Sequence, residues 1–319
     1  MLKRAAVGMA STLMRKFPAS PRRDDLSLGE IFRQVEYTAA SSADQDKRKL
    51  AASRWRYEDE ARNSSLVPFL PAVSPDDLRG KSVLDLGSNT GGRLICWKER
   101  YALGRACGID ISPTFEQASK LLARERGVDV EFRTGFGESL PWPNDAFDFV
   151  ISTDVLEHVR DVEQCMNECL RVLKPGGRML ARFPQFLQPY ESHLGLITPL
   201  PALHWVFSGK TITRAAYDVL ANREDARWYA PSSPELAAWE HLPSLNGISA
   251  SRFRSIVQRQ GWKVILQDRS PVRMARPKPG RPLFNLVRLA VVAAARVPFV
   301  EELLLDRLCY VLEKPGQRS

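Results

Sequence analysis

The sequence has few cysteines, no unbroken apolar run long enough to span a membrane, and no cluster of metal-ligand residues. Its 319 residues include five cysteines, and no two of them form a C-x-x-C pair, so the pattern indicates neither a zinc site nor a redox motif. The odd number is typical of a reducing compartment, and we expect a cytoplasmic protein. Because no carboxylates have metal-ligand spacing, we expect no bound metal.

The excess of basic over acidic residues lies in two segments. The net charge is +9, but residues 1–23 hold six bases and no acid, and residues 269–300 hold seven bases and no acid. The rest of the chain is therefore mildly acidic. The basic residues flank the predicted fold and do not form a stripe beside its ligand crevice. Together with the lack of an Asn-Pro-Pro-Tyr or Asp-Pro-Pro-Tyr motif, this distribution argues against a nucleic-acid substrate.

Both basic segments also carry apolar residues. Residues 1–27 read as a basic N-terminal tail, either disordered or forming an amphipathic helix on an anionic membrane. Residues 281–305 read as a helical insertion that Arg288, Arg296 and Pro298 interrupt, so it is too broken to cross a membrane. Arg281, Arg288 and Arg296 share one helical face, which indicates either peripheral contact with an anionic membrane or a helix packed on the protein with a solvated arginine face.

Strand and helix patterns alternate in the middle of the chain. This alternation is typical of an α/β fold with a mostly parallel sheet and helices on both faces, whose ligand crevice lies at the carboxyl ends of the strands. The strands are expected at residues 83–86, 106–109, 130–133, 147–152 and 178–183. We divide the chain into a tail (1–27), an N-terminal helical segment (28–79), a core (80–184), an acceptor lid inserted after the fifth strand (185–245) and a C-terminal part (246–319).

A glycine-rich turn follows the first strand. Residues 85–91 read Asp-x-Gly-x-Asn-x-Gly, which lacks the G-x-G-x-x-G spacing of a dinucleotide fingerprint. Asn89 stands where glycine is usual, and asparagine accepts left-handed backbone angles better than most residues. Asp110 ends the next strand, where a carboxylate can bind ribose hydroxyls. The pattern predicts an adenosine-containing cofactor.

This turn resembles the first motif of class I S-adenosylmethionine-dependent methyltransferases. Residues 135–142, 147–152, 154–159 and 173–178 follow in the order of the family's type 11 branch. The resemblance implies a Rossmann-like, seven-stranded sheet with an antiparallel last strand, leading helices over the cofactor, and S-adenosyl-L-methionine as the cofactor. By this resemblance the cofactor-binding residues are Asp85, Gly87, Ser88, Asn89, Gly91, Asp110, Ile111, Phe136, Gly137, Glu138 and Thr153. Phe136 replaces the usual aspartate, so adenine is expected to stack on it while Glu138 or a backbone carbonyl accepts the adenine amino group.

The resemblance implies methyl transfer to a small-molecule, glycan or lipid acceptor, most simply at oxygen. Asp154 and Thr153 are expected to face the methyl group. A hydroxyl acceptor needs a base, for which the candidates are His193, His158 and His204, with His193 first. The main alternative is a protein of the same fold that binds the cofactor without catalysis, as a scaffold at a membrane. Aminopropyl transfer is disfavoured because the paired aspartates for a polyamine are missing after the fourth strand.

Overall fold

A computed structural model describes residues 2–18, 42–189, 198–220, 246–268, 282–294, 297, 300–305 and 307–316. The chain divides into two compact units. We call Ala39–Gln185 with Ile248–Ser319 the sheet unit, and Met1–Thr38 with Phe186–Gly247 the helical unit. His193 lies outside the described residues.

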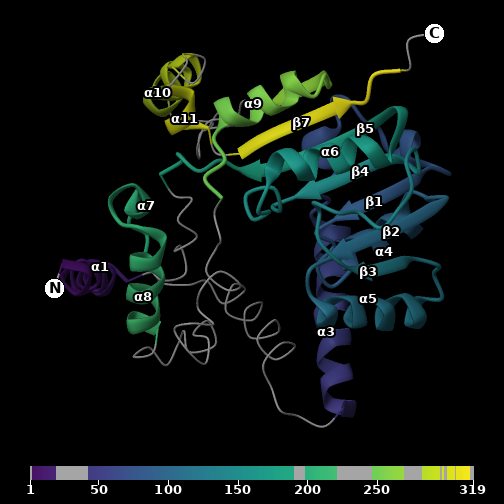
Figure 1. Cartoon of the computed structure of the whole chain (residues 1–319), viewed down its shortest axis with the longest axis horizontal. Coiled ribbons are helices and arrows are strands. Elements are labelled where there is room, and N and C mark those ends of the chain that lie inside the picture. Colours follow the sequence, from purple (N-terminus) through teal and green to yellow (C-terminus); the bar gives the residue numbers. More distant parts are fainter. Residues whose placement is uncertain are drawn as a thin grey trace. The chain divides into compact units, whose positions relative to one another are not determined.

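The sheet unit contains one seven-stranded sheet in the order β3-β2-β1-β4-β5-β7-β6. Figure 1 labels the part of this order from β3 to β7. The strands are β1 (Ser82–Leu86), β2 (Arg105–Asp110), β3 (Glu131–Thr134), β4 (Phe147–Thr153), β5 (Leu173–Pro184), β6 (Lys263–Asp268) and β7 (Arg307–Glu313). The first five pair in parallel, and β7 lies antiparallel to both β5 and β6. The predicted fold class is therefore confirmed. The order of the strands reverses between β1 and β4, which places the ligand crevice at the carboxyl ends of these two strands.

Helices cover both faces of this sheet. The short η1 (Val67–Phe69) and η2 (Pro75–Leu78) with α4 (Gly92–Arg100) and α5 (Pro113–Arg126) cover one face, and α6 (Val162–Val172) and α9 (Ala250–Arg259) cover the other. The sheet unit also contains α3 (Ser42–Arg62), which packs on α4 and α5, and α10 (Pro282–Ala294), which contacts α11 (Val300–Leu304). Successive strand residues point to opposite faces, so Leu84 packs with α6 and α9 while Val83 packs with α4, α5, η1 and η2. Both faces are thus apolar, as expected for a parallel sheet.

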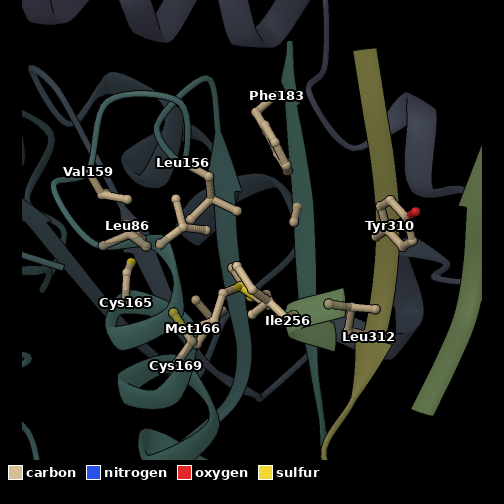
Figure 2. Packing of buried hydrophobic residues seen from close by; sticks show 14 of the residues in the cluster. Leu86, Leu156, Val159, Cys165, Met166, Cys169, Phe183, Ile256, Tyr310 and Leu312 are labelled. Carbon is tan, nitrogen blue, oxygen red and sulfur yellow. The ribbon is translucent and has the colours of Figure 1, made fainter. Parts of the chain in front are cut away.

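The core on the α6 face includes two of the cysteines. Figure 2 shows Cys165, Met166 and Cys169 of α6 together with Ile256 of α9 and Tyr310 of β7. All five cysteines are buried and free. The sequence pattern predicts a packing role for Cys165 and Cys169, one helical turn apart, and their place in this core confirms it.

The helical unit brings together two segments far apart in the sequence. Its described helices are α1 (Leu2–Lys16), α7 (Leu203–Val206) and α8 (Gly209–Leu220). Met14 of α1 is fully buried in a cluster with Ile212 and Ala216 of α8, and Arg15 Nη2 donates to the Asp218 carbonyl oxygen at 3.1 Å. Residues 1–27, predicted to be a basic N-terminal tail, thus include a helix whose apolar side packs on part of the predicted lid.

Candidate functional site

Three left-handed residues shape the turn between β1 and α4. Gly87, Asn89 and Gly91 have φ angles of +70°, +50° and +75°. A Cβ atom on Gly87 would lie 2.2 Å from Val155 Cγ2, so only glycine fits there. Asn89 adopts the left-handed conformation that the sequence predicts, and its side-chain oxygen accepts a hydrogen bond from the Thr90 amide at 2.7 Å.

Asp110 connects this turn with the next strand. Its Oδ2 accepts a hydrogen bond from the Asn89 amide at 2.8 Å, and its Oδ1 accepts one from the Ser112 amide at 3.1 Å. Burial raises the pKa of Asp110, although these two amides act in the opposite direction. The carboxylate therefore lies at the carboxyl end of β2, beside the turn, where the sequence predicts a ribose contact.

Asp85 is engaged by a residue that the sequence analysis missed. Arg93, in the first turn of α4, donates from Nε to Asp85 Oδ2 at 3.1 Å and from Nη2 to Asp85 Oδ1. Both side chains are buried. Burial acts to lower the pKa of Arg93, but the facing Asp85 outweighs it and the pKa is raised, so the guanidinium stays charged. Since Arg93 Nη2 also lies 3.4 Å from the Gly87 carbonyl oxygen, the pair braces the turn.

Helix α3 crosses over the same turn. Ser53 Oγ donates to the Thr90 carbonyl oxygen at 2.8 Å. A Cβ atom on Gly92 would lie 2.4 Å from the Ser53 carbonyl oxygen, so the absence of a side chain at Gly92 permits the close approach of α3 and α4. The resemblance places the leading helices over the cofactor, and α3 does contact the predicted cofactor turn.

Two exposed apolar side chains stand beside Asp110. Ile111 after β2 is 62% exposed and Phe136 after β3 is 50% exposed, which is unusual for large apolar residues at the end of a buried sheet. Glu138 Oε1 accepts hydrogen bonds from the Arg160 and Asp161 amides at 2.7 and 3.2 Å, so this oxygen stabilises the loop before α6. The predicted adenine contacts thus consist of two exposed apolar side chains and one carboxylate with one oxygen already hydrogen-bonded.

The remaining predicted cofactor residues are tightly packed. Ser88 is buried, and its amide donates to the Ile109 carbonyl oxygen at 3.0 Å. A Cβ atom on Gly137 would lie 2.9 Å from Cys165 Sγ. Thr153, the last residue of β4, has a buried Oγ1 without a hydrogen bond to any residue that the structure describes. This hydroxyl is available to a ligand at the carboxyl end of β4.

The candidate catalytic residues fall in different places. Asp154 follows β4 and forms an ion pair with Arg307 of β7. His158 lies in the same loop, with Nε2 3.8 Å from Oε1 of the buried Glu157. His204 belongs to the helical unit, where its Nε2 lies 2.8 Å from the Phe186 carbonyl oxygen. The sheet unit therefore brings Asp154 and His158 to the crevice edge that also carries the glycine turn.

Three arginines of the site were missed at the sequence level. Arg93 is the one charged residue among the first six of α4, Arg182 is the one charged residue among the last six of β5, and Arg307 precedes the apolar run of β7. A single arginine within an otherwise apolar stretch could have indicated these residues, because a buried arginine needs an acidic partner or a ligand. Within the part of the chain that the structure describes, no three His, Cys, Asp or Glu side chains are grouped as metal ligands.

The comparison with known families agrees with this geometry. Residues 84–181 match the family model of a methyltransferase domain, type 11. These residues form a class I S-adenosylmethionine-dependent methyltransferase domain of the type 11 branch, and its cofactor is S-adenosylmethionine.

Three curated relatives illustrate the range of acceptors. The ubiquinone biosynthesis O-methyltransferase of Chelativorans sp. (strain BNC1) is 34% identical over 31% of this chain and 39% of its own length. The demethylmenaquinone methyltransferase of Thermus thermophilus is 32% identical over 37% of this chain and 52% of its own length. The norajmaline N-methyltransferase of Rauvolfia serpentina is 28% identical over 75% of this chain and 82% of its own length. The chain thus spans about half or less of the first two relatives, and the names differ in the acceptor atom.

Proposed function

We propose that the chain transfers the methyl group of S-adenosylmethionine to an oxygen atom of a small-molecule, glycan or lipid acceptor. The observation that most supports the use of this methyl donor is the turn after β1, with its three left-handed residues and its hydrogen bond from the Asn89 amide to Asp110. In this proposal the methionine part of the cofactor lies along Gly87, Ser88, Asn89 and Gly91. Asp110 binds the ribose, Ile111 and Phe136 enclose adenine, and Gly137 and Glu138 border it.

The reaction is an in-line displacement. A lone pair of the acceptor oxygen attacks the methyl carbon, the bond from carbon to sulfur breaks, and its electron pair remains on sulfur, which gives S-adenosylhomocysteine. The acceptor hydroxyl loses its proton to a base. His158 is the candidate on the sheet unit, while His193 and His204 belong to the segments of the predicted lid. The protein contributes mainly orientation, because the sulfonium is already a good leaving group.

Asp85 has an indirect role in this proposal. Both of its carboxylate oxygens are bound by Arg93, and the side chain is 0% exposed. We therefore assign it to the cofactor site through Arg93, which also approaches the Gly87 carbonyl oxygen, and not through direct contact with the methionine part. Thr153 and Asp154 are assigned to the side of the site that faces the methyl group.

Mass spectrometry tests the proposed reaction. Cell extracts are incubated with S-adenosylmethionine that carries a labelled methyl group, with and without the protein, and products that gain the label are sought. We expect a product whose fragments carry the methyl group on oxygen. Calorimetric binding of S-adenosylhomocysteine without any labelled product would instead support the non-catalytic alternative, and label on nitrogen or carbon would contradict the acceptor atom.

We also propose that α10 makes peripheral contact with an anionic membrane, where a lipid acceptor would be reached. Leu286 and Leu289 on this helix are 65% and 56% exposed, and the surrounding residues 269–300 contain seven bases and no acid. An apolar helix surface next to basic residues suits the interface of anionic lipids. Helix α1 suits it less, because its Met14 is buried against α8. Among the described residues no helix is long and apolar enough to cross a bilayer.

A further inference from the structure

Arg182 is a charged residue in the apolar second half of β5. It lies on β5 between Ala181 and Phe183, both fully buried, and two residues before the strand ends. In the sheet register, Arg182 pairs with Thr153, the last residue of β4, and with Cys309 of β7. The side chain is half-buried, and its guanidinium makes no hydrogen bond or ion pair with any residue that the structure describes.

The carboxylates nearest to Arg182 do not form an ion pair with it. Arg307 lies two residues before Cys309 on β7, so it shares a sheet face with Arg182, and it is the partner of Asp154. Asp268 of β6 is level with Cys309 on the far side of β7, about 10 Å or two strand spacings from Arg182. The nearby carboxylate of Asp154 is thus taken by Arg307, and that of Asp268 lies one strand further away.

From this arrangement we propose that the acceptor carries an anionic group, a carboxylate or a phosphate, which Arg182 binds. This inference rests on the proposed methyl transfer. A half-buried guanidinium without a counter-charge is unfavourable, and an oxyanion offsets this because it accepts two parallel hydrogen bonds from the fork of the arginine. Thr153 Oγ1, which is level with Arg182 and also lacks a hydrogen bond among the described residues, donates to the same ligand.

The position of Arg182 also limits the size of the acceptor. The methyl group is expected beside the end of β4, and Arg182 is on the neighbouring strand. The anionic group and the methylated oxygen therefore lie about 5–10 Å apart, which is one to two strand spacings. Arg182 distinguishes anionic acceptors from neutral ones of the same shape.

Anion binding is tested with small probes on the protein saturated with S-adenosylhomocysteine, so that the cofactor site is filled. Benzoate and inorganic phosphate are titrated by calorimetry, with neutral benzamide as the isostere of benzoate. We expect saturable binding of at least one anion and weaker or no binding of benzamide. Arg182→Met should weaken anion binding about tenfold or more, and Arg182→Lys should retain part of it.

The matched control is Arg178→Met, on the same strand and the same sheet face but paired with Glu313. It should leave anion binding unchanged. Equal affinities for benzoate and benzamide, no saturable anion binding, or an unaltered affinity in Arg182→Met would overturn the inference. Arg182→Met should still bind S-adenosylhomocysteine as the unsubstituted protein does, which shows that it folds.

The labelled product of the extract experiment gives a second readout. It should bind an anion-exchange resin at neutral pH, because the group held by Arg182 is not the group that is methylated. A neutral product would overturn the anionic acceptor and leave the methyl transfer intact. Failure of the unsubstituted protein to bind S-adenosylhomocysteine would overturn both.

Discussion

Asp154 and Arg307 form an ion pair at the carboxyl edge of the sheet, although 153 positions separate them in the sequence. Asp154 has a left-handed backbone with φ +57°, and its amide donates to the Arg182 carbonyl oxygen at 2.8 Å. The pair therefore connects the loop after β4 with the start of β7. Because the Asp154 carboxylate is paired with Arg307 and its backbone with β5, we assign it a positioning role.

Asp154→Asn and Arg307→Met should each lower turnover without changing the affinity for S-adenosylhomocysteine. The double variant should be no worse than the poorer single variant, since both changes remove one interaction. The two side chains are 44% and 33% exposed, so each change should lower the free energy of unfolding by only about 1 kcal/mol or less. Kinetics and urea unfolding measure these effects. Loss of the acidic limb of the pH–rate profile in Asp154→Asn would identify Asp154 as the base and contradict the positioning role.

Asp110→Ala should weaken binding of S-adenosylhomocysteine by about 1–3 kcal/mol, because the hydrogen bonds from the ribose hydroxyls to a charged acceptor are lost. Calorimetry measures the change. Asp129→Ala, at an exposed position before β3, is the control and should bind normally. Equal affinities in the Asp110→Ala and control proteins would contradict the ribose assignment.

The same residue predicts a pH dependence of cofactor binding. Burial raises the pKa of Asp110 in the empty protein, and only the ionised form accepts both ribose hydroxyls. The affinity for S-adenosylhomocysteine should therefore be highest above this raised pKa and should fall as the pH is lowered through it. Asp110→Asn cannot titrate and should give a flatter profile. Calorimetry at a series of pH values distinguishes the two proteins. A profile of the same slope in both would show that another group titrates.

Arg93→Met should be strongly destabilising. Asp85 is 0% exposed, so removal of Arg93 leaves a buried carboxylate without its partner, which typically costs about 3–5 kcal/mol. Asp85→Asn in the same chain should recover part of this loss because it removes the charge. Urea unfolding of the single and double variants provides the measurement. If Arg93→Met unfolds at the same urea concentration as the unsubstituted protein, the turn is not held by this pair.

Leu286→Asn with Leu289→Asn should reduce flotation with anionic vesicles and have little effect with neutral ones. The expected association is sensitive to salt, since basic residues contribute to it. Val206→Asn is the matched control, because Val206 is 72% exposed but lies on α7 of the helical unit. Unchanged flotation of the α10 variant would contradict the membrane proposal.

The sequence predicted the parts of this protein that depend on local patterns. The central strands follow from short, nearly continuous runs of buried apolar residues, and the left-handed Asn89 follows from the intrinsic preference of asparagine. The ion pairs of Arg93 and Arg307 were missed. Arg307 meets Asp154 only because the sheet places β7 beside β5, and no local pattern carries that information. The packing of Met14 against α8 was missed for the same reason.

The helical unit consists of two segments that are far apart in the sequence, so its first helix is synthesised well before the helix that it packs against. Arg15 of α1 contacts Asp218 of α8, which is 203 positions further along the chain. At about 5–20 residues per second, the ribosome exposes α1 for roughly 10–40 s before its partner emerges. During that interval the apolar side of a short helix is uncovered, which makes it a target for a chaperone.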